Sequence, residues 1–371
     1  MLLLSAVIDR DDVPVASKRT ILYWWVAIFT LFRGLRWDVG TDWDQYLEVF
    51  SKSGWDNIFT YARNSSIHME PGYIILNAFI KSFGFNYTGY LLLTNFFVLY
   101  AYARFSLTNS RNPVLVFVLF MFSTQFFPVR IGIAVAVLIL GLCDFSKKRH
   151  LRVFICIFIA MNIHSSAMVF FPVYCMIFIK KIPTKLAVTV AFLWLQLASV
   201  PAYNDFLFSL VGNLNFLGEE TTHKFENYLD YDPTLHGNTA IKLISGYLSS
   251  VVFIVLLWIF GNMITKKGAI IRRDNINFGF MFNVYYVFMM ISIAFPGDNM
   301  AGLRRLQNYF MFAFPVLYAA YIVYAKNKYP NYRYFFTFMF IGYALFRVYA
   351  LFFGRELFVN FPYRSVLDDV F

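Results

Sequence analysis

Apolar runs recur along the whole chain and are separated by short polar segments. The runs are continuous rather than alternating with a period of two, which favours helices over the strands of a β-barrel. We therefore predict an all-α, polytopic helical membrane protein with about eleven transmembrane helices. The predicted spans are 21–35, 88–105, 113–127, 131–145, 151–163, 167–179, 186–200, 241–264, 278–294, 306–324 and 334–353.

One further apolar segment, residues 74–83, is too short to cross a membrane. A helix rises about 1.5 Å per residue, so this segment covers roughly half of a hydrocarbon layer that is about 30 Å thick. Counting it as a crossing would also place the strongest clusters of basic residues on the outer side, against the positive-inside bias. We expect a re-entrant or interfacial helix on the outer side of the membrane.

Composition and charge agree with this class. Of the 371 residues, 59% are hydrophobic and 14% are charged. The net charge of +11 comes from short clusters of Lys and Arg between the apolar runs, which indicates cytoplasmic loops rather than a surface for nucleic acid. Lys18 and Arg19 precede the first span, so the N-terminus should be cytoplasmic. The three cysteines lie within apolar runs, where buried thiols are expected rather than disulfides or zinc ligands.

This topology gathers the unusual polar segments on the outer side of the membrane. They are the loops near 36–73, 201–240 and 295–305 and the turns 125–130 and 162–166. The longest loop, 201–240, is expected to be a lid or a substrate-recognition segment. No repeat divides the chain, and residues 1–371 are predicted to form a single integral membrane domain.

Three arginines stand out because they lie on the side that the positive-inside bias disfavours. Arg130 opens an apolar helix, and Arg304 and Arg305 follow a polar segment, residues 295–299. An outward guanidinium is well suited to hold a phosphate or pyrophosphate with two hydrogen bonds. The alternatives are an interface anchor for Arg130 and a loop ion pair of Asp298 with one of the other two.

His164 lies in a turn between two apolar pieces that are bounded by basic clusters at their far ends. Each piece is only about 20 Å long as a helix, so the turn should be recessed in the outer leaflet. Irregular backbone at this depth must line a cavity or be covered by protein. His164 is therefore either a structural hydrogen-bonding residue or a site residue that binds phosphate or moves a proton.

Carboxylates of the outer loops are candidates for a general base or for accepting hydrogen bonds from sugar hydroxyls. The alternative is that a polar loop simply needs solvated charge. These carboxylates are Asp38, Asp42, Asp44 and Glu70. Nearby aromatic side chains could stack on sugar rings, although an ordinary interfacial belt is favoured. They are Trp37, Trp43, Tyr46 and Tyr73.

No metal site is expected. His223 lies near several acidic residues in the long loop, but no second histidine stands at helical spacing from it. Outward cations around a recessed pocket instead suit a substrate with a pyrophosphate head and a lipid tail. Transfer of a glycosyl group from such a lipid needs stabilisation of the departing pyrophosphate and a base for the attacking hydroxyl. Arginines can stabilise the pyrophosphate without a metal, so no cofactor is expected.

A series of short motifs occurs in the outer segments. In chain order they are Arg36-x-x-Val39-Gly40-Thr41-Asp42-x-x-x-Tyr46, then Glu70-Pro71-Gly72-Tyr73-x-x-Leu76-Asn77, then Arg130 with Ala134 and Ala136, then His164-Ser165-Ser166-Ala167, then Arg304-x-x-x-x-Tyr309. In this order the motifs resemble the EpsG-like group of polysaccharide polymerases, which includes the Wzy O-antigen polymerases. The resemblance covers residues 20–325, and it is weakest before them, where relatives usually have a fuller extra span.

The resemblance implies a metal-independent glycosyltransferase with a GT-C-like architecture, acting at the periplasmic face of the bacterial inner membrane. It would transfer a growing undecaprenyl-pyrophosphate-linked glycan onto the non-reducing end of a new lipid-linked repeat unit. Its partners would be the lipid-linked donor and acceptor, membrane lipid and a chain-length regulator protein. The alternatives are an O-antigen ligase or another lipid-linked-sugar glycosyltransferase and, from a different class, a flippase for the same lipid.

The residue patterns and the resemblance together give two sets of site residues. The predicted catalytic set is His164, Arg130, Arg304 and Asp42. The predicted substrate-binding set is Arg36, Arg305, Glu70, Tyr46, Asp44 and Tyr73. The cations would hold the pyrophosphate, and the carboxylates and tyrosines would form the acceptor side.

Overall fold

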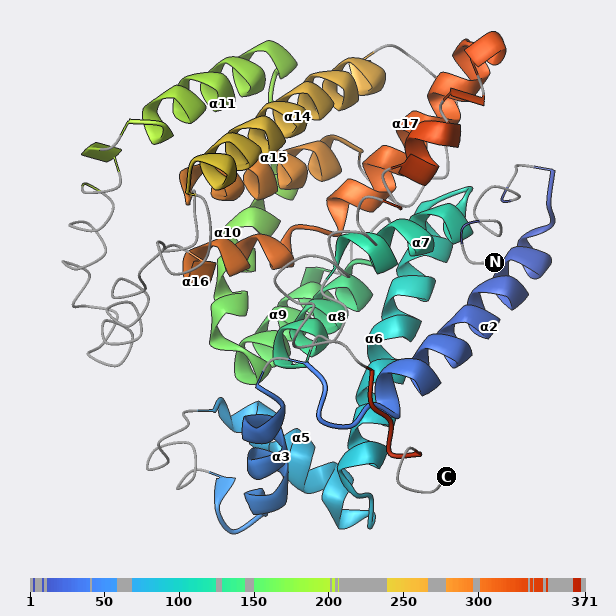
Figure 1. Ribbon diagram of the computed structural model, residues 1–371, viewed down its shortest axis with the longest axis vertical. Coiled ribbons are helices and arrows are strands. Elements are labelled where there is room, and N and C mark those ends of the chain that lie inside the picture. Colours follow the sequence, from blue (N-terminus) through green and yellow to red (C-terminus); the bar gives the residue numbers. More distant parts are fainter. Residues whose placement is uncertain are drawn as a thin grey trace. The chain divides into compact units, whose positions relative to one another are not determined.

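Every regular element that the computed structural model describes is a helix (Figure 1). The all-α prediction is therefore confirmed for this part of the chain. The structure describes residues 3, 9, 12–40, 42–58, 69–124, 129–143, 150–200, 202–203, 206, 239–265, 278–295, 301–332, 334–335, 337–342, 345 and 363–367.

Two of the described helices are long and apolar enough to cross a membrane. They are α6 (Tyr87–Asn109) and α14 (Thr239–Thr265), the latter over Gly246–Met263. Shorter apolar helices are α7 (Pro113–Ser123), α8 (Arg130–Leu142), α9 (His150–Ile163), α11 (Thr184–Ala198) and α15 (Phe278–Ala294). These apolar helices suggest a membrane protein. The count of about eleven crossings and the membrane depth of each helix stay predictions.

Two predicted spans are not single helices. The run 167–179 is divided among η2 (Ser165–Val169), α10 (Phe170–Tyr174) and η3 (Cys175–Phe178). Pro172 interrupts the helical hydrogen bonds there, because it has no N–H to donate and its ring crowds the preceding turn. The run 306–324 likewise begins as η7 (Arg305–Tyr309), and α17 (Ala313–Lys328) starts only after it. The predicted span 334–353 runs into residues outside the described part of the chain.

The chain divides into two compact units. The first consists of Met1–Phe171, Ile271–Ile276 and Tyr318–Phe371, and the second of Pro172–Ile270 and Asn277–Leu317. The single membrane domain expected from the sequence would contain both units, and it stays a prediction.

The first unit is organised around α6, which packs against α2 (Val15–Gly34), α7 and α8, while α8 packs against α9. At the end of α2 the two helices approach closely. A Cβ added to Gly34 would lie 2.6 Å from Cδ2 of Leu92, so this position requires glycine. Tyr102 of α6 stacks on Phe120 of α7 with ring centroids 4.8 Å apart, which fills the space between these helices.

The basic residues before the predicted first span lie inside α2, because the helix begins earlier than the apolar run does. Lys18 is buried, and its Nζ lies 2.9 Å from Oδ1 of Asp9 and 2.8 Å from the carbonyl oxygen of Arg111. The other Asp9 oxygen accepts hydrogen bonds from the amides of Val114 and Leu115 at 2.8 and 3.0 Å. Asp9 thereby satisfies the free amides at the start of α7. Burial raises the pKa of Asp9, although Lys18 favours its charged form.

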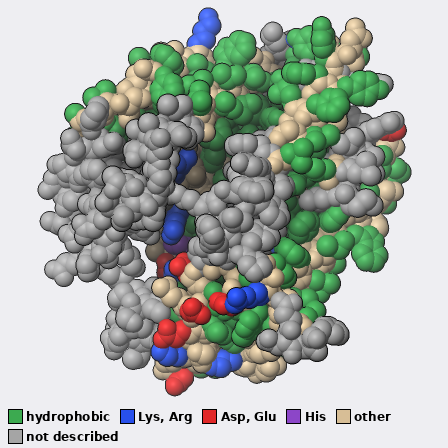
Figure 2. Space-filling model, in the orientation of Figure 1, with side chains coloured by type: hydrophobic (Ala, Val, Ile, Leu, Met, Phe, Trp, Pro, Cys, Tyr) green, Lys and Arg blue, Asp and Glu red, His purple; other side chains and the backbone are tan. Residues whose placement is uncertain are grey.

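Two short helices of the first unit carry much of the polar segment 36–73, which the sequence predicts to lie on the outer side. The apolar runs do not predict α3 (Trp43–Lys52), because it is short and half polar. Its buried residues, Trp43, Val49 and Phe50, nevertheless recur at helical spacing. α5 (Pro71–Ser82) matches the short helix expected at 74–83. Charged side chains of both signs gather over α3 and α5, whereas the visible surface of α2 is mostly hydrophobic (Figure 2).

The second unit contains α11, α14 and α15 packed together. A Cβ added to Gly261 of α14 would lie 2.3 Å from Cγ2 of Thr184, so the backbone of α14 lies directly against the Thr184 side chain at the start of α11. Lys181 donates to the Gly261 carbonyl at 2.9 Å and to the Thr184 hydroxyl at 2.7 Å. Asn283 of α15 accepts a hydrogen bond from the amide of Ile182 at 2.9 Å. These polar contacts fix how the three helices meet.

The C-terminal segment, residues 363–367, lies against the segment that follows α2, and no pattern in the sequence predicts this contact. The amide of Trp37 donates to the carbonyl of Arg364 at 2.9 Å, and the amide of Val366 donates to the carbonyl of Leu35 at 3.0 Å. The two segments thus form a short antiparallel bridge. It places C-terminal side chains beside the first motif of the chain.

Candidate functional site

Glu70 is at the centre of a polar group that joins three parts of the first unit. Its Oε2 accepts a hydrogen bond from Nη1 of Arg130 at 2.7 Å, which makes an ion pair. Its Oε1 accepts hydrogen bonds from the amide and the hydroxyl of Ser165 at 2.8 and 2.9 Å. Nδ1 of His164 lies 3.6 Å from the same oxygen and 3.0 Å from the Ser166 hydroxyl. We call these five residues the Glu70 cluster.

Local sequence positions each member of this cluster. Glu70 directly precedes α5, Arg130 is the first residue of α8, and His164 follows the last residue of α9. Gly72 lets α5 approach the turn after α9, because an added Cβ would lie 2.7 Å from the carbonyl oxygen of Asn162. A carboxylate at the start of a helix is also favoured by the helix dipole. The structure therefore brings together Glu70, Arg130 and His164, which the sequence places in separate outer segments.

The charges of the cluster are balanced internally. Burial alone would raise the pKa of Glu70, but Arg130, the amide of Ser165 and His164 hold that pKa below its usual value. Glu70 is therefore ionised at neutral pH and neutralises Arg130. An incoming anion must share Arg130 with Glu70 or displace the carboxylate. Within the described part of the chain, Nε of Arg130 makes no hydrogen bond, so the guanidinium retains a donor.

Tyr46 and Tyr73, both predicted to bind substrate, lie against Arg130. The guanidinium carbon lies 5.7 Å from the ring centroid of Tyr46 and 5.8 Å from that of Tyr73. The two rings meet edge to face with centroids 6.1 Å apart. Tyr73 is fully buried, so its geometry favours positioning of Arg130 through a cation–π contact rather than stacking on a sugar.

Arg36 lies in the same aromatic surroundings but is only 2% exposed. Its guanidinium carbon lies 5.7 Å from the ring centroid of Trp43. Burial lowers the pKa of Arg36 to about 10, so the side chain remains charged at neutral pH. Arg33 is also fully buried, and its Nη2 donates to the sulfur of Met121 at 3.9 Å. Arg33 is not among the predicted site residues, although a second arginine at the end of an apolar run could have indicated it.

The remaining predicted carboxylates, Asp38, Asp42 and Asp44, are exposed. Oδ2 of Asp38 lies 3.2 Å from Nη1 of Arg364. Asp42 precedes α3 with a left-handed backbone, φ 61°, and its side chain does not cap the helix. Among the described residues, no hydrogen bond or ion pair joins Asp42 to the Glu70 cluster. Its catalytic role stays a prediction.

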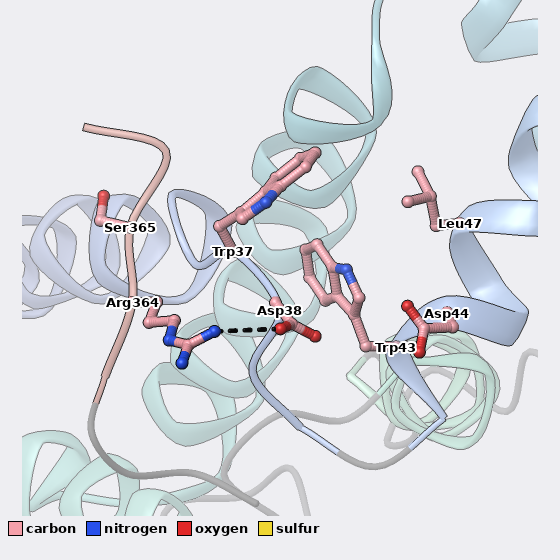
Figure 3. A pocket seen from close by; sticks show the side chains of 7 residues that line it. All are labelled: Trp37, Asp38, Trp43, Asp44, Leu47, Arg364 and Ser365. Carbon is pink, nitrogen blue, oxygen red and sulfur yellow. Dashed lines mark hydrogen bonds and ion pairs between the residues drawn. The ribbon is translucent and has the colours of Figure 1, made fainter. Parts of the chain in front are cut away.

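Asp38 and Asp44 instead line an open pocket of about 650 Å³ beside the start of α3 (Figure 3). We call it the Trp37 pocket. Its other lining residues are Trp37, Trp43, Leu47, Arg364 and Ser365. The pocket joins the first motif of the chain to the C-terminal segment, and it is lined by none of the residues of the Glu70 cluster.

A comparison with protein families matches residues 20–365 to the EpsG family. The chain belongs to the EpsG family. This family is associated with exopolysaccharide synthesis. The match contains the whole Glu70 cluster and the whole Trp37 pocket, including the C-terminal residues that line it. Comparisons with curated proteins and with solved structures found no match.

In this EpsG-family protein the other two predicted arginines lie in the second unit. Arg304 ends α16 (Ala301–Arg304) and Arg305 begins η7. Their part in one site with Arg130 stays a prediction. Three stretches lie outside the described residues: residues 125–128 of the predicted turn 125–130, Asp298, and residues 207–238 of the predicted loop 201–240.

Other EpsG site residues were not assigned from the sequence. Ser165 gives Glu70 two hydrogen bonds, and its place next to His164 in a motif was the available signal. Arg364 has no such signal, because its contact with Asp38 depends on the long-range bridge. The part of the chain that the structure describes has no group of three or more His, Cys, Asp or Glu side chains placed to hold a metal ion. Metal independence stays a prediction.

Proposed function

We propose that this protein is a polysaccharide polymerase of the Wzy O-antigen type, acting at the periplasmic face of the bacterial inner membrane. It transfers a growing undecaprenyl-pyrophosphate-linked glycan onto the non-reducing end of a new lipid-linked repeat unit. Membership of the EpsG family supports a role in polysaccharide synthesis. The observation that carries the proposed reaction is the Glu70 cluster, in which a guanidinium and an imidazole meet at one carboxylate.

In the proposed reaction, a hydroxyl oxygen of the acceptor forms a bond to the anomeric carbon of the donor. The bond between that carbon and the pyrophosphate oxygen breaks, and undecaprenyl pyrophosphate leaves with the electron pair. The hydroxyl proton passes to a base of the protein. The charge that develops on the leaving oxygen requires fixed positive groups, and a guanidinium can provide them without a metal.

Arg130 is suited to the leaving group. The carboxylate of Glu70 lies 2.7 Å from its guanidinium and two aromatic rings lie beside it, so the guanidinium is already oriented when an anion comes to share it with Glu70. We also propose Arg304 and Arg305 as phosphate ligands on the basis of their positions in the sequence, with Arg36 as a buried supporting charge.

His164 is suited to act as the base. Imidazole exchanges protons near neutral pH, and a carboxylate 3.6 Å from its Nδ1 stabilises the imidazolium that proton transfer creates. Glu70 is itself a weak base, because its pKa is lowered. Its proposed role is to position Arg130 and His164 relative to one another.

The proposed activity is tested by synthesis in a defined system. Purified protein in lipid vesicles is given a lipid-linked repeat unit together with a chelator, and the lipid products are separated by length. We expect a ladder of products. Attachment of single repeats to a separate acceptor, or passage of the lipid across the bilayer without a new bond, would contradict the polymerase in favour of a ligase or a flippase. A ladder that requires added metal would contradict the arginine-based step.

A further inference from the structure

The Trp37 pocket combines two indoles with two carboxylates and a guanidinium (Figure 3). Its volume of about 650 Å³ lies within the range of roughly 300–1,000 Å³ that is usual for small-molecule sites. Three segments form it: the loop before α3, the first turns of α3 and the C-terminal segment. The proposed chemistry of the Glu70 cluster does not use this pocket.

The two indoles form a supported aromatic surface. Their rings meet edge to face with centroids 5.6 Å apart. Trp43 is only 6% exposed, and its ring packs against Tyr87 with ring centroids 5.0 Å apart. The guanidinium carbon of Arg36 lies 5.7 Å from the ring centroid of Trp43. Trp37 is 36% exposed and therefore offers part of its ring to a ligand. Because Trp43 is fixed by buried neighbours, a ligand that stacks here orders few side chains on binding.

The polar groups of the pocket provide acceptors and one cation. The side chains of Arg364 and Asp38 form an ion pair but are 61% and 52% exposed. A pair this exposed contributes little stability, so a ligand can compete for either partner. Asp44 adds a second exposed carboxylate. The pocket therefore has a negative charge balance, which disfavours acidic ligands.

We propose that the Trp37 pocket is a binding subsite for a neutral or amino-substituted saccharide. One sugar ring stacks its C–H face on Trp37, and its hydroxyl groups donate hydrogen bonds to Asp38 and Asp44. A sugar ring has an apolar face and a polar edge, which matches an indole beside carboxylates. Arg364 donates to sugar oxygens from the opposite segment. The C-terminal bridge is then part of the binding site, because it holds Arg364 in place.

Assignment of this saccharide to the lipid-linked repeat unit rests on the proposed function, whereas the binding of a sugar does not. The probe is the free repeat-unit oligosaccharide, released by mild acid from the lipid-linked intermediates of the same cells. Its dissociation constant is measured by saturation-transfer NMR on the full-length protein in nanodiscs. The matched control is Trp55→Ala, because Trp55 is 55% exposed and does not line the pocket.

Wild-type protein and Trp55→Ala should bind the oligosaccharide equally. Trp37→Ala should weaken binding on the order of tenfold, and Trp37→Phe, which keeps an aromatic ring, about threefold. Absence of binding to wild-type protein, or equal binding by Trp37→Ala and Trp55→Ala, would overturn the inference. The two proposals can fail separately. If the synthesis assay gives a product ladder but the protein does not bind the oligosaccharide, only the subsite is overturned. If binding depends on Trp37 but the synthesis assay gives no ladder, only the polymerase is overturned.

Discussion

The Glu70 cluster and the Trp37 pocket belong to the same unit, but their polar groups are arranged differently. In the cluster, one carboxylate receives hydrogen bonds from Arg130 and Ser165 at 2.7–2.9 Å, and its side chain is 17% exposed. In the pocket, Asp38 has one exposed ion pair beside a partly exposed indole. Fixed, partly desolvated charges suit stabilisation of a transition state, whereas exposed rings and acceptors suit recognition. We therefore propose that the cluster is a centre for chemistry and that the pocket is a surface for binding.

Substitution of one arginine in each region should give the largest difference in activity between the Glu70 cluster and the Trp37 pocket. Arg130→Ala removes the proposed contact with the leaving group and leaves Glu70 without its ion pair, so polymer synthesis should fall by at least about 10²–10³-fold. Arg364→Ala removes the same charge from the pocket and should lower synthesis by less than about tenfold at limiting substrate. The measurement is the initial rate per folded protein in membrane vesicles. Similar losses in both variants would contradict the division.

The histidines offer the next comparison. His164→Ala should lower the rate of synthesis by about 10²–10⁴-fold, the usual contribution of a general base. His223→Ala, in the long loop, should retain nearly full activity. Rates of both variants at several pH values check this, because the slow His164 variant should also lose the pH dependence that a titrating base confers. Equal tolerance of the two substitutions would remove His164 from the reaction.

The ion pair of Glu70 predicts a specific dependence of stability on pH. Because the folded-state pKa of Glu70 is lowered, the pair contributes its full stability above the unfolded-state pKa of about 4.3 and loses it as the pH falls through the folded-state value. The Tm difference between wild type and Glu70→Gln should therefore not decrease from about pH 7 to pH 5, and it should shrink only below about pH 4.

Glu48→Gln is the control for this measurement, because Glu48 pairs with Lys52 on the exposed face of α3. It should change Tm little at any pH. A difference for Glu70→Gln that already shrinks between about pH 7 and pH 5 would show that the pKa of Glu70 is raised instead.

Substitutions at the rim of the Trp37 pocket should have the smallest effects. Asp38→Asn should change the free energy of unfolding by less than about 1 kcal/mol, because its ion pair is exposed. It should raise the KM for the acceptor by roughly three- to tenfold and leave kcat unchanged, as expected for uniform binding. Steady-state kinetics with varied acceptor provide the check. A lower kcat at unchanged KM would place Asp38 in the chemical step.

The sequence predicts the helical class and selects Glu70, Arg130 and His164, because apolar runs and basic clusters predict that their segments lie on one side of a membrane. It does not predict that Arg130 and Glu70 neutralise each other. Nor does it predict the contact of Glu70 with Ser165, which depends on how closely α5 approaches the end of α9, an approach that Gly72 allows. Topology decides which segments lie on the same side of a membrane, whereas packing decides which of their side chains pair.

Two further features could not be read from local patterns. α3 contains too few apolar residues to form a run. It can be recognised as a helix only from the spacing of Trp43 and Phe50, which share one buried face. The bridge between Arg36 and Ser365 joins positions far apart in the chain through backbone groups, which every residue possesses. The Trp37 pocket depends on both features. The sequence therefore names Trp37, Asp38, Trp43 and Asp44 as candidates but does not predict the pocket that they form with the C-terminal segment.

Product ladders from reconstituted wild-type protein, Arg130→Lys and Glu48→Gln, at equal amounts of folded protein, test whether the Glu70 cluster carries out the proposed chemistry. Lysine keeps the charge at position 130 but cannot form the two-pronged contact of a guanidinium. We predict a full ladder from wild type and Glu48→Gln and almost none from Arg130→Lys. A full ladder from Arg130→Lys would contradict the account.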